Sequence, residues 1–159
     1  MKQTLLTLCF VILAIALSAQ TGLFGLSYGD SHSKVKSTLG ASDLNFTETM
    51  NSEDSYTYTN DSNIYVDHIN CFFDTDLDEL VAWQVFYLEQ DDDSIEDIVY
   101  NSAMDWHDFE PEWDDYLECD YWLFEDGRTL YAGWDYDYEF YVAEYYNDDY
   151  PQYSFFEVW

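Results

Sequence analysis

Residues 117–142 read LECDYWLFEDGRTLYAGWDYDYEFYV, and apolar residues alternate with polar ones along most of this segment. A period of two is typical of a β-strand with one buried face and one solvated face. The Asp126-Gly127 dipeptide interrupts the alternation, and its tolerance of positive φ favours a tight hairpin turn. The segment therefore predicts a hairpin whose return strand has an aromatic face, made of Leu130, Ala132, Trp134, Tyr136, Tyr138, Phe140 and Val142.

The return strand is too long to run straight through a small domain, since a strand rises about 3.3 Å per residue. We expect a bend, a bulge or a three-residue turn between Asp135 and Tyr138, each of which keeps the alternation in phase. A two-residue turn would reverse the phase.

If the aromatic face is the core, the opposite face is exposed and mixes tyrosine with carboxylates. We predict that this face binds a partner through Tyr131, Asp135, Asp137, Glu139, Tyr141 and Tyr145.

The N-terminus has the features of a secretory signal peptide. Lys2 precedes an apolar run over Leu5–Leu17, and small residues follow it, which suits cleavage before Gln20. No second apolar run is long enough to span a bilayer. We therefore expect residues 1–19 to be a signal peptide and residues 20–159 to form one exported domain, periplasmic or secreted.

The composition is strongly acidic and strongly aromatic. The 159 residues include 34 acidic and 4 basic ones, for a formal net charge of −30, and 21% are aromatic. So much aromatic mass argues for a packed core, because disordered acidic chains lack it. The few Lys and Arg residues cannot neutralise a row of phosphates, which excludes nucleic acid as a partner. The negative field favours a basic partner or a cation, while solubility or a saline habitat is the alternative explanation.

Two helices divide the chain into similar halves. Ser31 or Ser33 caps a first helix that Gly40 ends, and Ser94 caps a second helix that Pro111 ends. Each helix precedes a set of strands, expected over 55–59, 63–73 and 80–89 in the first half and, in the second half, in the hairpin of 117–142, near 139–146 and over 153–159. The order predicts an α+β fold of tandem α-β-β-β repeats, about 22–90 and 91–159.

The helix opening and the hairpins resemble a known group. Gly25-Leu26-Ser27, then Val35 and the Leu39-Gly40 pair, followed by paired aromatic hairpins, are similar to the small exported α/β repeats of the β-lactamase-inhibitor-like group, and the SmpA-type outer-membrane assembly lipoproteins share this opening. The resemblance implies two helices packed on one face of an antiparallel sheet, with the other face free for a protein partner. The chain lacks the lipid-attachment cysteine of the lipoproteins, and the resemblance transfers no functional residue.

Two cysteines remain after the signal peptide, Cys71 and Cys119. Each is in phase with apolar neighbours of its predicted strand, and an oxidising compartment would allow them to pair. Closing this loop would stabilise the fold by about 3–4 kcal/mol in the chain-entropy model. Two separate buried thiols are the alternative.

A calcium-like spacing occurs at Asp74, Asp76 and Asp78. An EF-hand loop needs Gly at its sixth position and Glu at its twelfth, and the chain has Glu79 and Val85 there. The sequence is therefore inconsistent with an EF-hand and leaves a looser calcium site open. No other cofactor is indicated.

Catalytic motifs are weak. Ser27 lies in a G-x-S-x-G pattern, but a nucleophile elbow needs a strand before it and a large parallel sheet around it. His32, His68 and His107 have no metal-ligand spacing. We therefore expect a non-catalytic exported protein that presents an acidic, tyrosine-rich sheet face to a basic protein, in the manner of an inhibitor or an immunity protein. A calcium- or glycan-binding surface protein and a salt-adapted protein without a specific partner are the alternatives.

Overall fold

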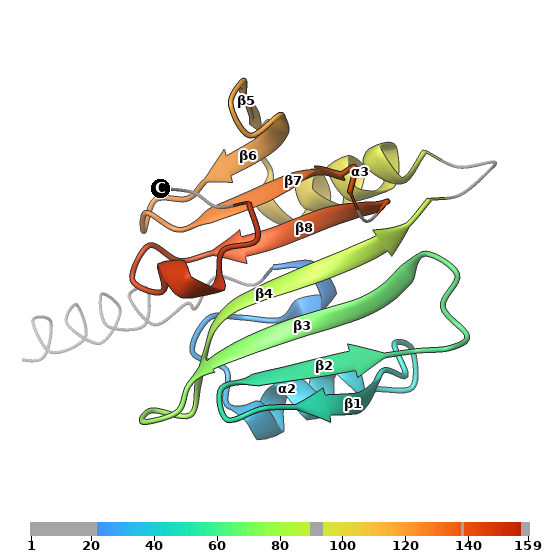
Figure 1. Cartoon of the computed structure of the whole chain (residues 1–159), viewed down its shortest axis with the longest axis vertical. Coiled ribbons are helices and arrows are strands. Elements are labelled where there is room, and N and C mark those ends of the chain that lie inside the picture. Colours follow the sequence, from blue (N-terminus) through green and yellow to red (C-terminus); the bar gives the residue numbers. More distant parts are fainter. Residues whose placement is uncertain (1–21, 90–93, 138, 157–159) are drawn as a thin grey trace, which may run out of the picture.

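The computed structural model describes residues 22–89, 94–137 and 139–156. Its strands are β1 Thr47–Asn51, β2 Ser55–Thr59, β3 Val66–Asp74, β4 Glu79–Leu88, β5 Glu112–Asp114, β6 Cys119–Leu123, β7 Thr129–Asp135 and β8 Phe140–Tyr146. They form one antiparallel sheet in the order β1-β2-β3-β4-β8-β7-β6-β5 (Figure 1). The α+β class predicted from the sequence is confirmed.

Two α-helices lie behind the sheet in Figure 1, α2 over His32–Leu39 and α3 over Ile95–His107. The side chains of Ser31 and Ser94 cap them, as predicted, by accepting hydrogen bonds from the backbone N–H groups three residues later. The 3-10 helix η1, Leu23–Gly25, contacts both helices. The buried residues of the helices and the inward residues of both halves of the sheet share one core. Both helices therefore cover the same face, as predicted.

Each half consists of a helix followed by four strands, rather than the three that were predicted. The halves meet where β4 pairs with β8, so the last strand of each half lies at the centre of the sheet. The additional strands, β1 and β5, are at the two edges. Most residues of both edge strands are exposed, and β5 has only three residues, so neither has an apolar periodicity that marks a strand.

The turn between β7 and β8 reverses the alternation that the sequence analysis expected to be preserved. Trp134 pairs with Tyr141 and Asp135 pairs with Phe140, which leaves the four residues 136–139 in the turn. Cross-strand partners share a face, and a four-residue turn shifts the phase by one residue relative to a three-residue turn. Leu130, Ala132 and Trp134 therefore lie on the helix-covered side, as predicted, whereas Phe140 and Val142 lie on the opposite side.

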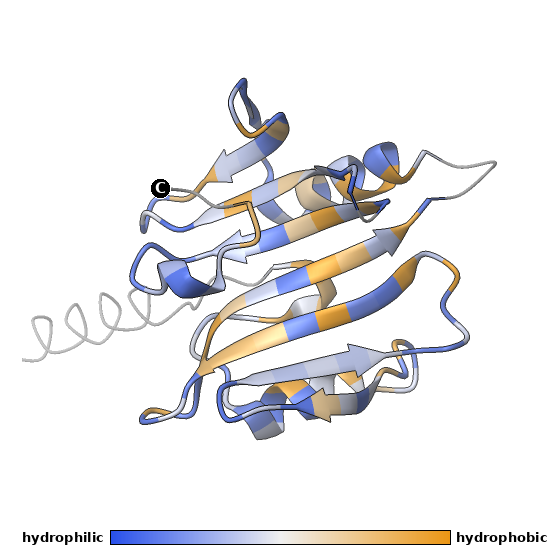
Figure 2. Cartoon of the chain, viewed as in Figure 1, coloured by the Kyte–Doolittle hydropathy of each residue, from blue (hydrophilic) through white to orange (hydrophobic). Residues whose placement is uncertain are grey.

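The sheet face opposite the helices is not simply solvated, because the chain returns across it. We call residues 150–156 the C-terminal arm; it contains the 3-10 helix η2, Pro151–Tyr153 (Figure 1). The strand predicted over 153–159 is absent from the part of it that the structure describes, residues 153–156. β4 is buried on both faces, as its largely apolar sequence predicts, and in Figure 2 its orange and pale bands are interrupted by a blue one.

The predicted disulfide is contradicted by the structure. Cys71 and Cys119 are both buried and both free. Cys71 belongs to the core beneath the helices, while Cys119 packs with Tyr131 and Tyr146 on the other face. Three strands lie between β3 and β6 in the sheet. The alternation in the sequence assigned the wrong face of β6 to the core beneath the helices. The core residue of that strand is Trp122, and Cys119 lies on the opposite face.

Residues 1–19, the predicted signal peptide, lie outside the described residues. Among the helices that the structure describes, none combines the length and the apolar character needed to cross a membrane.

Candidate functional site

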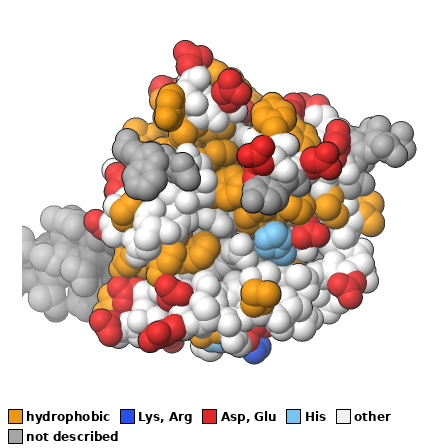
Figure 3. Space-filling model, in the orientation of Figure 1, with side chains coloured by type: hydrophobic (Ala, Val, Ile, Leu, Met, Phe, Trp, Pro, Cys, Tyr) orange, Lys and Arg blue, Asp and Glu red, His pale blue; other side chains and the backbone are white. Residues whose placement is uncertain are grey.

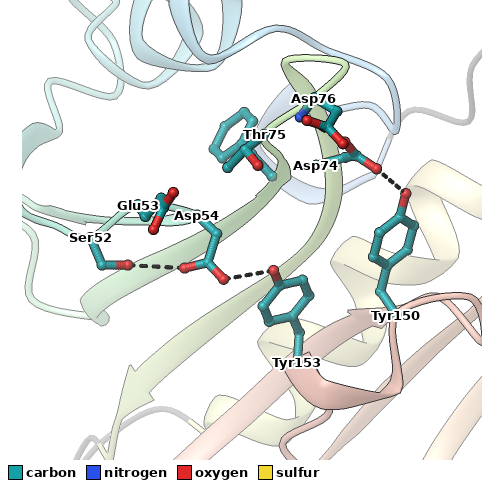
Figure 4. A pocket seen from close by; sticks show the side chains of 9 residues that line it. Ser52, Glu53, Asp54, Asp74, Thr75, Asp76, Tyr150 and Tyr153 are labelled. Carbon is teal, nitrogen blue, oxygen red and sulfur yellow. Dashed lines mark hydrogen bonds between the residues drawn. The ribbon is translucent and has the colours of Figure 1, made fainter.

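A pocket of about 440 Å³ opens where two hairpin turns meet the C-terminal arm. One wall is the β1–β2 turn and another is the β3–β4 turn, and the arm provides two tyrosines (Figure 4). We call it the acidic pocket, since four of its lining side chains are carboxylates. The described residues that line it are Ser52, Glu53, Asp54, Phe73, Asp74, Thr75, Asp76, Tyr150 and Tyr153.

Two tyrosines of the arm tie it to the turns. The Tyr153 hydroxyl donates a hydrogen bond to Asp54 Oδ2 at 2.8 Å, and the Tyr150 hydroxyl donates to Asp74 Oδ2 at 2.7 Å (Figure 4). The second oxygen of each carboxylate is also engaged. Asp54 Oδ1 accepts from the Ser52 hydroxyl, and Asp74 Oδ1 accepts from two backbone N–H groups of its own turn. Hydrogen bonds within each turn therefore orient both carboxylates independently of the arm.

These hydrogen bonds keep the two aspartates ionised. The Tyr153 hydroxyl, followed by that of Ser52, holds the pKa of Asp54 below its ordinary range. The Tyr150 hydroxyl and the backbone of the turn do the same to the pKa of Asp74. Conversely, the hydrogen bond to Asp74 raises the pKa of Tyr150 to about 12. The pocket thus presents fixed negative charge and neutral hydroxyl groups over the whole physiological pH range.

The arm is anchored by a buried polar pair in the middle of the sheet. Gln84 on β4 and Glu144 on β8 face each other in the register and hydrogen-bond at 3.0 Å. Gln84 Nε2 also donates to the carbonyl oxygen of Tyr153 at 2.7 Å. The two oxygens of Glu144 accept the backbone N–H groups of Phe155 at 2.6 Å and Phe156 at 3.3 Å. We call Gln84 and Glu144 the arm clamp.

Burial dominates the electrostatics of the clamp. Glu144 is fully buried, and desolvation raises its pKa to about 7, although the hydrogen bonds from the arm and from Gln84 oppose the shift. A carboxylate buried this deeply needs hydrogen-bond donors to its oxygen atoms. Three of those donors come from the clamp partner and the arm, so Glu144 stabilises the arm in place and the arm stabilises Glu144.

Aromatic contacts accompany the clamp along the arm. Tyr153 stacks on Phe72 of β3 with ring centroids 4.7 Å apart, and Phe155 meets Phe86 of β4 edge to face at 5.4 Å. Phe156 lies 6.1 Å from the ring of Tyr131 on β7. The arm therefore crosses several strands and buries apolar surface that the sheet would otherwise expose.

The acidic pocket combines ionised carboxylates with neutral hydroxyl groups. Carboxylates whose pKa is lowered are weak bases, and tyrosines whose pKa is raised are weak acids. The described lining includes no His, Cys, Lys or Arg. Ionised oxygens around a cavity attract a cationic group, and the hydroxyl groups supply further polar contacts.

The predicted partner-binding residues are divided by the fold. Asp135 lies on the open face at the end of β7, and Asp137 and Glu139 are exposed in the turn that follows. Tyr131 is on the open face but is covered by the arm and by Tyr146. Tyr141 and Tyr145 are buried beneath the helices, so their predicted exposure is wrong, because the four-residue turn places them on the other side.

The predicted calcium residues are divided as well. Asp74 and Asp76 line the acidic pocket, but Asp78 accepts a hydrogen bond from the backbone N–H of His32 at the start of α2. Asp54 and Glu53 take its place beside them. Within the described ranges, no group of three or more His, Cys, Asp and Glu side chains is arranged to hold a metal ion.

Sequence reasoning missed Asp54, Tyr150, Tyr153 and the arm clamp. The local signal for the clamp is a single polar residue within an apolar run, which is Gln84 in one strand and Glu144 in the other. Nothing local links Asp54 to Tyr153, which is 99 residues further along the chain.

Comparison with known proteins found no match. No family model, curated protein or solved structure resembles this chain at a significant level.

Proposed function

We propose that this protein is a non-catalytic exported binding protein, inhibitor-like or immunity-like, that presents its acidic surface to a basic protein partner. The observation that carries the proposal is the acidic pocket, where the fold brings Asp54 and Asp74 from separate turns into one cavity and tyrosine hydroxyls keep both ionised. A Lys or Arg side chain of the partner is the chemical group that fits such a cavity.

The wider surface supports the same partner chemistry. In Figure 3, Asp and Glu side chains lie mainly around the margin of the open sheet face, and apolar side chains lie over its middle. A polar, charged margin around an apolar centre is the usual composition of a protein interface. The net charge of −30 would accelerate encounter with a cationic surface. The exposed Asp137 and Glu139 extend this field beyond the pocket.

The test measures binding of a hexa-lysine peptide by calorimetry to the purified protein and to two variants of equal charge. Asp54→Asn with Asp74→Asn removes two of the four carboxylate charges of the pocket, and each asparagine keeps one of the two oxygen acceptors of the aspartate it replaces. Glu110→Gln with Glu118→Gln removes two exposed charges elsewhere and is the matched control.

We expect the pocket variant to bind about tenfold more weakly and the control pair to lose much less, since exposed charge pairs contribute up to about 1 kcal/mol each. Raising the salt from about 0.01 M to about 1 M shortens the Debye length from about 30 Å to about 3 Å and should abolish binding to the wild type. Equal losses of affinity in the two variants would mean that the peptide binds through the overall negative charge and not through the pocket. An affinity that does not change with salt would refute the electrostatic proposal.

A further inference from the structure

A second cavity, larger than the acidic pocket, lies on the helix-covered side of the molecule. Its volume is about 620 Å³, within the range of about 300–1,000 Å³ typical of small-molecule sites. Residues of η1, the segment after α2, the start of β3, the end of β4 and one side of α3 line it. It therefore lies at the junction of the two halves of the chain.

The walls of this cavity are mainly apolar. Phe24 of η1, Leu44 after α2 and Ile98 of α3 are each only partly buried and pack at the edge of the core. Trp106 of α3 is 49% exposed at the rim. Carbon-rich walls that stay accessible cost free energy unless something covers them.

One polar side chain in the wall of this cavity, Tyr87, has a hydroxyl that is free to bind a ligand. Tyr87 of β4 is 5% exposed and lines the cavity. Its backbone pairs with β3 and β8, but its hydroxyl forms no hydrogen bond with any residue that the structure describes. Burial raises the pKa of Tyr87, so the hydroxyl remains a neutral donor. Among the described side chains only Trp83 Nε1 is fully enclosed without a partner, so the Tyr87 hydroxyl is accessible, and the acceptor of a ligand in the cavity can reach it.

Backbone strain occurs in the same wall. Phe24 has φ 64 and ψ 15, in the left-handed region that a bulky residue rarely adopts. Its ring packs edge to face on Phe46, with centroids 5.8 Å apart. Such strain costs about 1–3 kcal/mol and is concentrated at ligand-binding segments. Here it occurs at a residue of the cavity wall.

We propose that this cavity binds a small, uncharged, largely apolar molecule that carries one hydrogen-bond acceptor, and that the Tyr87 hydroxyl donates to that acceptor. The net charge of the chain repels anions. A cation would lose its hydration inside, because Asp43, the only charged residue of the described lining, is exposed at the margin. The site shares no lining residue with the acidic pocket, which lies at the other end of β3.

The experiment compares two ligands that differ by one acceptor, naphthalene and 2-acetylnaphthalene, by equilibrium dialysis against the purified protein. Tyr87→Phe removes the donor and little volume. Tyr141→Phe is the matched control, since Tyr141 pairs with Tyr87 on the adjacent strand and is outside the described lining. Ser102→Phe places a ring in the cavity from α3 and should exclude both ligands.

We expect both ligands to bind the wild type and Tyr141→Phe equally well. Tyr87→Phe should weaken 2-acetylnaphthalene about twofold to tenfold, the effect of one neutral hydrogen bond, and leave naphthalene unchanged. The proposal is overturned if neither ligand binds up to its solubility limit or if Tyr87→Phe affects the two ligands equally. Undiminished binding to Ser102→Phe would place the ligands elsewhere and overturn it as well.

Discussion

Replacement of Glu144 by glutamine should change how the stability of the protein depends on pH. In the folded state the pKa of Glu144 is raised to about 7 by burial, against an ordinary value of 4.5 that applies once the chain unfolds. Between these values the folded state keeps a proton that the unfolded state has released. The contribution of Glu144 to stability is therefore fully present below pH 4.5 and is lost as the pH rises through 7.

The size of this loss follows from the difference between the two pKa values, and it amounts to about 3 kcal/mol. Glu144→Gln cannot ionise, so it lacks this loss. The amide oxygen can still accept from Phe155 and Gln84, whereas the amide nitrogen faces the N–H of Phe156 and cannot accept from it. The variant should thus be less stable than the wild type in acid and should gain on it as the pH rises.

The assay is urea unfolding, followed by the fluorescence of the six tryptophans, at several values from about pH 5 to about pH 8. We expect the difference in unfolding free energy between Glu144→Gln and the wild type to shift by about 3 kcal/mol in favour of the variant. Glu110→Gln is the control, because Glu110 is exposed. The difference in unfolding free energy between Glu110→Gln and the wild type should not change with pH. A flat difference for Glu144→Gln, or one that falls with pH, would refute the account of Glu144 as a buried, desolvated carboxyl.

Three further outcomes are expected. Tyr153→Phe removes the main donor to Asp54, and the pKa of Asp54, followed by carboxyl NMR, should rise; an unchanged value would mean that the hydrogen bond does not form in solution. Leu39→Ala truncates a fully buried side chain of α2 and should lower the unfolding free energy by about 2–5 kcal/mol in urea, whereas a change below about 1 kcal/mol would contradict its place in the core. Because Cys71 and Cys119 are free and on opposite faces, alkylation of the unfolded, unreduced protein should label both, as mass spectrometry of their peptides would detect; recovery of a peptide joined by a disulfide would contradict the fold.

Much of the secondary structure can be predicted from the sequence because its signals are local. Serines at helix starts, glycine after α2 and the Asp126-Gly127 turn each act within a few residues. Alternation along β3 and the continuous apolar run of β4 indicate a half-covered strand and a fully covered one. From these elements the α+β class and the placement of both helices on one face followed.

The candidate site could not be predicted in the same way. Asp54 and Asp74 each lie in an ordinary polar turn, and only the pairing of β2 with β3 and the path of the arm bring them into one pocket. The acidic composition is equally uninformative, because so many carboxylates make any single pair unremarkable. The prediction of Tyr141 and Tyr145 as exposed was wrong because one residue of turn length, which composition does not specify, decides the face of every residue in β8.

The sequence by itself determined the helices, most of the strands, the layered arrangement and the negative charge, since these depend on periodicity, capping and composition. Only the tertiary structure decided which face each aromatic residue occupies, that the two cysteines lie apart, and that the arm covers the sheet through Glu144 and Gln84. The physical reason is that these features depend on contacts between distant segments, whose free energy is set by the whole packed arrangement and leaves no local pattern.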